Sequence, residues 1–251
     1  MILMYHHIAP PEVVPKDRAP LEGWNFIHSP KGFERQLVEL RRRGYRFVSL
    51  GSLVDDLKKN AIEPTKTIAL TFDDGWLDNF SYAFPILKGL SIPAIFFCTT
   101  RHIQNGVNEA KKMTVAQLQE LLAAGMSIGG HTRAHPDLTK LALEQAREEI
   151  AGCKSDLEQA LGVEVKFFAY PGGAFNQDVV RLTQEAGYTA ACSVLGPAHN
   201  DRSSLFWLYR DVLSESMTTW ADRYRLSPPM RWLLQFRIAR RLNQRLELPT
   251  C

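Results

Sequence analysis

The sequence predicts an α/β fold in which a parallel sheet closes, or nearly closes, into a (β/α) barrel. Short apolar runs alternate with helical patterns along the 251 residues. The runs are almost continuously apolar, which is typical of parallel strands that are covered on both faces. Roughly seven such strand–helix units follow one another, the number expected for a barrel of this type.

Eight runs are predicted to be strands. The strongest is "TIALTF" (67–72), in which every residue is apolar or β-branched. The last run is "LFWLYRDVL" (205–213). In chain order the predicted strands are 2–6, 45–50, 67–72, 93–98, 126–130, 165–170, 188–194 and 205–213.

Helical patterns separate these runs. The first begins at Pro30 after a possible N-cap, Ser29, and repeats apolar residues at helical spacing until Gly44. Glycines also end the later helical patterns, as is common at helix C-termini. In chain order the predicted helices are 30–43, 52–60, 78–90, 114–124, 142–161 and 176–186.

Composition limits the classes of protein to consider. Hydrophobic residues make up 45% and charged residues 23%, as in ordinary globular domains. A net charge of +3 is too small to indicate a nucleic-acid partner. No run reaches the roughly 18 apolar residues of a membrane span, and the opening "MILMYHHIAPPE" does not resemble a secretion signal, so we expect a cytoplasmic protein.

The four cysteines form no CxxC pair and match no zinc or disulfide pattern. Reduced thiols fit the expected compartment, and Cys98 and Cys192 are interpreted as small buried residues. His28 and His102 are expected at the surface. No repeat or linker interrupts residues 1–221, which are predicted to form one catalytic domain, followed by a tail at 222–251.

Polar side chains follow five of the predicted strands. In (β/α) barrels the carboxyl ends of the strands meet at one rim, where active sites are built. Five separate stretches are therefore expected to place polar residues at the same rim. They are His6 and His7, Asp73 and Asp74, His131 and His135, Pro171 to Gly173, and Arg210 with Asp211.

Two adjacent carboxylates oppose each other's ionisation, and a cation is the simplest way to offset that repulsion. Two imidazoles and one carboxylate suit zinc and its neighbours in the first transition row and leave a position open for water. The spacing of His131 and His135 can put both rings on one side of a helical turn. One aspartate would bind the metal, and its neighbour would take a proton from the attacking water.

Each motif has an ordinary structural explanation when taken alone. A DDG sequence is most often a turn or a helix N-cap, and "YPGG" is a turn. An HxxxH pair is usually a surface coincidence. The functional interpretation depends on finding all of them at successive strand ends.

In order and spacing, "TFDDG", "HTRAHPDL" and "FFAYPGG" resemble the polysaccharide deacetylase, or NodB-homology, family over roughly residues 1 to 215. The opening "ILMYHHI" is similar to the branch that includes poly-N-acetylglucosamine deacetylases, in which the catalytic histidine motif comes first in the chain. The resemblance implies a distorted barrel of about seven strands and a divalent metal, most simply Zn, with Co, Ni or Fe as alternatives.

The resemblance also implies roles for single residues. Asp73 corresponds to the general base, Asp74, His131 and His135 to the metal ligands, and His6 to the general acid. If the roles of the two histidines are reversed, His7 is the acid and His6 is its neighbour.

Residues near the third motif depart from the family. Pro171 is retained as part of the substrate site, but Gly172 replaces the usual tyrosine and keeps only the backbone N–H that helps to hold an oxyanion. Ala169 stands where an arginine often orients the base. Arg210 resembles an arginine of this branch and would tether Asp73, with a surface ion pair as the alternative.

Two further side chains are interpreted from their positions. Trp76 either lines the substrate groove or packs in the core. Asp137 is expected to cap the turn that follows His135.

The implied reaction is hydrolysis of an N-acetyl group on an amino sugar of a glycan or lipid-linked saccharide. The alternatives are a hydrolase of another amide and a sugar-binding protein without activity. Neither the sugar nor the oligomeric state follows from the sequence.

The tail has its own pattern. Between Arg223 and Leu246 there are seven arginines and no acidic residue, and the pattern becomes helical after Pro229. Such a helix can lie on an anionic membrane, here through residues 229–246 at its inner face. Packing against the barrel or a second subunit is the alternative.

Overall fold

The structure is a computed structural model of the whole chain. It describes residues 1–10, 12–13, 27–60, 66–101, 111–196 and 200–217. The predicted tail and His102 therefore lie outside the described residues. Among the helices that are described, none has the length and apolar character needed to cross a membrane.

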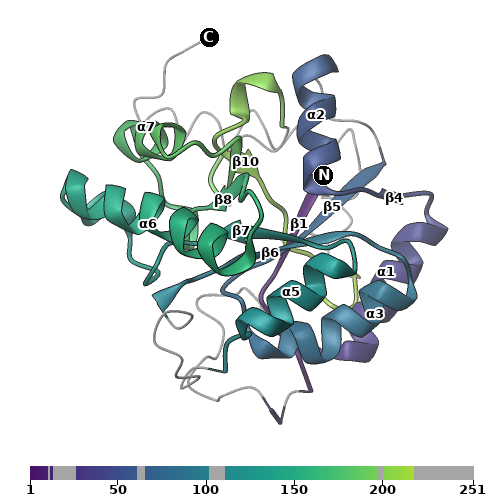
Figure 1. Cartoon of the computed structure of the whole chain (residues 1–251). Coiled ribbons are helices and arrows are strands. Elements are labelled where there is room, and N and C mark those ends of the chain that lie inside the picture. Colours follow the sequence, from purple (N-terminus) through teal and green to yellow (C-terminus); the bar gives the residue numbers. More distant parts are fainter. Residues whose placement is uncertain (11, 14–26, 61–65, 102–110, 197–199, 218–251) are drawn as a thin grey trace.

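Seven parallel strands form the barrel that the sequence predicts (Figure 1). They follow one another in the order β1, β5, β6, β7, β8, β9 and β10, and β4 pairs with β5 outside this path. The strands are β1 Ile2–Tyr5, β4 Arg46–Phe47, β5 Thr67–Phe72, β6 Ala94–Cys98, β7 Ser127–Gly130, β8 Phe167–Ala169, β9 Ala190–Ser193 and β10 Leu208–Tyr209.

One bridge joins the two ends of this path. The amide of Asp211, just after β10, donates to the carbonyl of Ile2 at 2.8 Å, and the Asp211 carbonyl accepts from the amide of Met4 at 2.9 Å. The last predicted strand, 205–213, is therefore much shorter than expected, because the chain leaves β9 after Arg210 and turns to β1. A 3-10 turn at Arg202–Ser204, capped by Asp201, shortens it from the other side.

The helices lie close to their predicted positions and surround the barrel (Figure 1). The predicted helix at 78–90 is split into a π-helical turn, Asn79–Ala83, and α3, because Pro85 has no N–H to donate at the start of α3. The helices are α1 Pro30–Arg42, α2 Leu50–Asn60, α3 Phe84–Gly89, α5 Val115–Ala123, α6 Leu143–Leu161 and α7 Gln177–Glu185.

The interior of the barrel forms a separate apolar cluster that includes helix α2. Its strand members are Ile2, Ala69, Ile95, Phe97, Phe167, Ala169, Ala190, Cys192 and Leu208. Leu53 and Leu57 of α2 pack with them and are fully buried. Several of these strand residues begin their strands, so α2 covers the amino-terminal end of the barrel and the carboxyl-terminal end remains for polar residues.

A small parallel sheet was not predicted. It pairs β2 (His7–Ile8) with β3 (Ile27–His28). The prediction that His28 lies at the surface is wrong. Its side chain is buried, its Nε2 donates to the Leu213 carbonyl at 3.1 Å, and its ring packs edge-on against Tyr5.

The expectation for the cysteines is confirmed where the structure describes them. Cys98, Cys153 and Cys192 are all free and buried. Burial raises the pKa of each of the three thiols to about 12, so they remain protonated and behave as small apolar residues.

Candidate functional site

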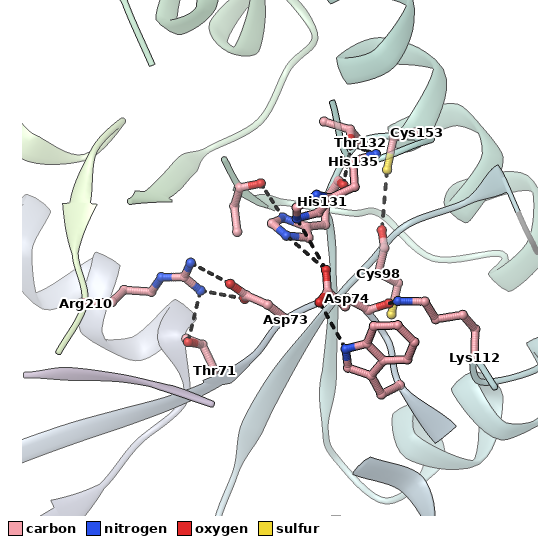
Figure 2. Close-up of polar contacts among 12 residues, drawn as sticks. Thr71, Asp73, Asp74, Cys98, Lys112, His131, Thr132, His135, Cys153 and Arg210 are labelled. Carbon is pink, nitrogen blue, oxygen red and sulfur yellow. Dashed lines mark hydrogen bonds and ion pairs between the residues drawn. The ribbon is translucent and has the colours of Figure 1, made fainter. Parts of the chain in front are cut away.

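The carboxyl ends of the strands bring the predicted polar residues together (Figure 2). Asp73 and Asp74 directly follow β5, His131 follows β7, and Arg210 follows β10. In Figure 2, Asp73 lies between Arg210 and Asp74, and His131 and His135 lie above the two aspartates. The site thus gathers charged and imidazole groups at one end of the barrel.

Arg210 holds the first aspartate from inside the barrel. Its two terminal nitrogens donate to the two carboxylate oxygens of Asp73 at 2.6 and 2.7 Å, and one of them also donates to Thr71 Oγ1 at 3.3 Å. The side chains of Arg210 and Asp73 are only 1% and 3% exposed. The contact expected from the sequence is therefore present, and it is a buried bidentate pair instead of a surface ion pair.

Asp73 stays ionised despite its burial. Removal from water would raise the pKa of its carboxyl group, but the Arg210 guanidinium and the nearby imidazoles outweigh this effect and hold the pKa below the usual value. The sequence predicted that a cation offsets the repulsion between the two aspartates, and for Asp73 that cation is the guanidinium of Arg210.

Asp74 lies on a tight turn and is held differently. Its φ of 72° and that of Gly75, 68°, are both left-handed. The indole Nε1 of Trp76 donates to Asp74 Oδ2 at 3.0 Å, and Lys112 Nζ donates to the Asp74 carbonyl oxygen at 2.7 Å. Burial alone would raise the pKa of this carboxyl group. The positive charge of Lys112 and the surrounding histidines outweigh that effect and keep the pKa well below the ordinary range.

The two histidines direct their Nε2 atoms toward Asp74. His131 Nε2 lies 3.6 Å and His135 Nε2 3.5 Å from Asp74 Oδ1, and the two rings meet edge to face. One ligand atom from each of the three residues lies within 4.8 Å of the others. His135 is 45% exposed at its side chain, so the group opens toward solvent on that side.

The donor set fits a divalent metal. His131 Nδ1 donates to the Ala169 carbonyl at 2.7 Å, which places the lone pair on Nε2. Burial lowers the pKa of His131 to about 4, and the ring is therefore neutral near pH 7, as a metal ligand must be. His131, His135 and the Asp74 carboxylate together form a donor set typical of zinc and neighbouring metals.

The segment from His131 to His135 is not the helical turn that the spacing suggested. Thr132 and His135 both have left-handed φ values, 64° and 62°, and the backbone between them is not helical. The Thr132 hydroxyl accepts from the His135 amide at 2.8 Å and thereby closes the turn. Backbone strain at two positions, which periodicity does not reveal, brings the rings together.

Helix α6 supports this turn from outside the site. Arg133 donates to both carboxylate oxygens of Asp156 at 2.8 Å, and Asp156 also accepts from Thr100 at 2.7 Å. Gly152 of α6 has no side chain where the Arg133 guanidinium lies across the helix. Beyond the turn, Asp137 caps the 3-10 turn Leu138–Lys140, as expected.

The histidine doublet is divided between two environments. Burial lowers the pKa of His6, while Asp73 and Asp74 raise it, so His6 lies within the electrostatic field of the carboxylates. His7 instead bonds through Nδ1 to Asp78 at 2.6 Å and stacks on Trp76 with ring centroids 4.9 Å apart. Consecutive residues of an extended strand point to opposite faces, which explains the division.

The "YPGG" segment forms a 3-10 turn, Pro171–Gly173, after β8. Gly172 is exposed and left-handed, with φ 59°, and a Cβ placed there would meet nothing within 4 Å. Pro171 is buried. Where the sequence lacks the tyrosine of the family motif, the structure has open space.

Trp76 is 6% exposed, and its surroundings match the packing alternative better than an open groove wall. Lys112 and Asp78 were not singled out in the sequence. The position of Asp78, shortly after the DDG motif, is a weak sequence signal that it belongs to the site. Lys112 comes from a distant segment, and nothing in the sequence connects it with the site.

Comparisons with known proteins agree with this geometry. Residues 60–191 match the sequence model of the polysaccharide deacetylase family. YxkH of Bacillus subtilis (strain 168) is 26% identical over 86% of this chain and 72% of its own length. Poly-beta-1,6-N-acetyl-D-glucosamine N-deacetylase of Staphylococcus aureus (strain MRSA252) is 25% identical over 76% of this chain and 69% of its own.

Solved structures extend the likeness to the whole fold. The Streptococcus pyogenes deacetylase PplD, in complex with acetate, superimposes with a TM-score of 0.76 at 27% identity, over 93% of this chain and 96% of that one. IcaB from Ammonifex degensii gives 0.74 at 23% identity, over 90% and 96% of the two chains, a likeness of fold. The family match covers more than half of the chain, and the chain therefore belongs to the polysaccharide deacetylase family of hydrolases.

Proposed function

We propose that this protein is a metal-dependent hydrolase that removes an N-acetyl group from an amino sugar of a glycan or lipid-linked saccharide. The observation that carries the proposal is the convergence of Asp74, His131 and His135 beside the buried Asp73–Arg210 pair. These three residues would hold one divalent ion, most simply Zn. When bound, such an ion supplies Lewis-acid chemistry that polarises the acetyl carbonyl and acidifies water.

Asp73 is the proposed general base. Arg210 fixes both of its oxygens and keeps it ionised, while each carboxylate oxygen retains a second lone pair to accept a proton. Asp73 takes a proton from water as the oxygen attacks the acetyl carbon. Because the base is locked in place, little reorganisation is needed when the bond forms.

His6 is the proposed general acid. The C–N bond breaks only if the departing nitrogen receives a proton, since an amide anion is a very poor leaving group. His6, which lies in the field of Asp73 and Asp74, would donate that proton to yield acetate and a free amine. The N–H of Gly172, which is exposed within the turn after β8, would stabilise the negative oxygen.

Acetate release from a panel of N-acetylated glycans, assayed with and without added divalent metal, tests this function. We expect release from at least one glycan, loss of activity on chelation, and recovery when metal is restored. His131→Ala should lose both the metal and the activity. A variant that keeps one tightly bound metal per chain and normal turnover would show the ligand assignment to be wrong.

A further inference from the structure

The turn that carries Asp74 needs external support. Asp74 and Gly75 are both left-handed, a conformation that is unfavourable for a residue with a side chain. An aspartate held in such a geometry at a functional site must be fixed by its surroundings. Which groups fix it determines how rigidly its carboxylate faces the imidazoles.

A distant segment pairs with this turn. The Leu77 amide donates to the Lys111 carbonyl at 2.7 Å, and the Met113 amide donates to the Gly75 carbonyl at 2.9 Å. Trp76 and Lys112 thereby form an antiparallel bridge. Residues 111–113 thus pair with the residues that follow Asp74 and hold them in place.

The two oxygens of the Asp74 carboxylate are divided between different partners. Oδ2 accepts the indole N–H of Trp76 at 3.0 Å. Oδ1 is the oxygen that faces His131 Nε2 and His135 Nε2, at 3.6 and 3.5 Å. A carboxylate with one oxygen occupied in this way presents the other in a single orientation.

The indole itself is locked. Lys112 Nζ lies 3.1 Å from the centre of the Trp76 ring and also donates to the Asp74 carbonyl, and the His7 ring stacks on the indole. Trp76 and Lys112 are 6% and 8% exposed. An ammonium against an indole face is an electrostatic attraction as well as a packing contact. The ring therefore has little freedom to swing away from Oδ2.

We propose that Trp76 is a positioning residue for the metal ligand Asp74, with its indole N–H orienting the carboxylate and Lys112 clamping the ring and the turn. This inference rests on the proposed function, because it assumes that Asp74, His131 and His135 bind a metal. Groups that orient a ligand typically contribute about 10- to 100-fold to metal affinity. A tryptophan that only filled space would contribute nothing of this kind.

Trp76, and not Lys112, offers the clean test. Removing the Lys112 charge would loosen the turn but would also relieve its repulsion of a cation, and the two effects on metal affinity oppose each other. Trp76→Phe changes no charge and keeps an aromatic ring for Lys112 and His7. It removes the N–H donor and part of the ring.

The experiment measures the metal dissociation constant of the metal-free full-length protein by competition with a chelator of known affinity. We expect Trp76→Phe to raise the dissociation constant about tenfold or more. The matched control is Trp207→Phe, which makes the same change at a half-buried ring that stacks on Phe175. Its dissociation constant should stay within about twofold of the wild type.

A second variant separates the N–H from the shape of the ring. Benzothienylalanine at position 76 replaces the indole N–H by sulfur and keeps both rings, so it should fold even if Trp76→Phe does not. We expect the same loss of affinity. A wild-type dissociation constant with the isostere in place would overturn the inference.

The two proposals fail in different ways. A wild-type protein that binds no divalent metal contradicts the proposed function. A wild type that binds metal tightly, with Trp76 variants that bind equally well or lose no more than Trp207→Phe, leaves the function standing and refutes the positioning role.

Discussion

At the scale of single residues, two adjacent aspartates are stabilised by different groups. Asp73 faces a buried guanidinium. Asp74 faces two imidazoles and an indole N–H, and its own backbone carbonyl oxygen accepts a hydrogen bond from Lys112. Each carboxylate is kept ionised by its own surroundings, and the pKa of each lies below the usual value. The separation allows two chemically identical neighbours to take the two roles proposed for them, base and metal ligand.

Replacing Asp73 with Asn should remove the base and leave the metal ligands intact. We expect the variant to bind metal like the wild type and to lose about a hundredfold or more in kcat/KM, the usual scale for a general base. Metal content by mass spectrometry and acetate release check this. Asp178→Asn, an exposed carboxylate of α7, is the matched control and should be fully active. An active Asp73→Asn enzyme would remove Asp73 from the mechanism.

The histidine doublet gives a second prediction. His6→Ala should keep its metal yet lose about a hundredfold in rate, because the departing amine then lacks its proton donor. His7→Ala should be milder, since His7 is paired with Asp78. Steady-state kinetics on the same glycan compare the two variants. A dead His7 variant beside a nearly normal His6 variant would reverse the assignment.

At the scale of elements, sequence patterns predicted the strands well and the connections less well. Strand β5 has the predicted bounds because its apolar run is buried throughout. Each functional side chain lies where polarity interrupts an apolar run, and this made most of the site visible in the sequence. The left-handed turn at His131–His135 could not be predicted, because it depends on Thr132 and on contacts with α6.

Contacts between residues far apart in the chain could not be predicted from the sequence either. Lys112 pairs with Trp76 through a bridge between distant segments, and no periodicity or motif records such a pairing. His28 appeared to be a lone surface histidine because its partners, Leu213 and Tyr5, come from opposite ends of the described chain. Arg210 was anticipated through the family resemblance, and its depth of burial was not.

The link between the His131–His135 turn and α6 gives a prediction about stability. Arg133→Met would leave Asp156, a carboxylate only 6% exposed at its side chain, without its bidentate partner. Breaking a buried pair costs about 3–5 kcal/mol, and the partial exposure of Arg133 reduces this to about 2 kcal/mol. The free energy of unfolding from urea denaturation measures the loss.

Arg147→Met on α6 is the control. It breaks an exposed pair with Glu185, for which we expect less than about 1 kcal/mol. Equal losses in the two variants would mean that the buried pair does not stabilise the turn beyond an ordinary surface contact.

At the scale of the whole molecule, the described residues form the barrel and its site, and the predicted tail lies beyond them. We propose that residues 229–246, which hold five of the tail's seven arginines, bind anionic membranes, at about 1 kcal/mol for each basic residue near the surface. Sedimentation with anionic vesicles should bring down the full chain at low salt and less of it at moderate salt.

A chain truncated after Ser227 and neutral vesicles are the controls. If the full chain sediments no better than the truncated one, the tail has a structural role, such as packing against the barrel or a second subunit.

The bridge between Leu3 and Asp211 has a consequence for the order in which the protein acquires its abilities. The three proposed metal ligands are all synthesised by residue 135, whereas Arg210 reaches Asp73 across 137 positions and only when the seam of the barrel closes. Contacts between distant positions tend to form late in folding, after the local strand–helix units. A growing chain should therefore bring the proposed metal ligands together before Arg210 reaches the proposed base, so that hydrolysis would begin only when the barrel is complete.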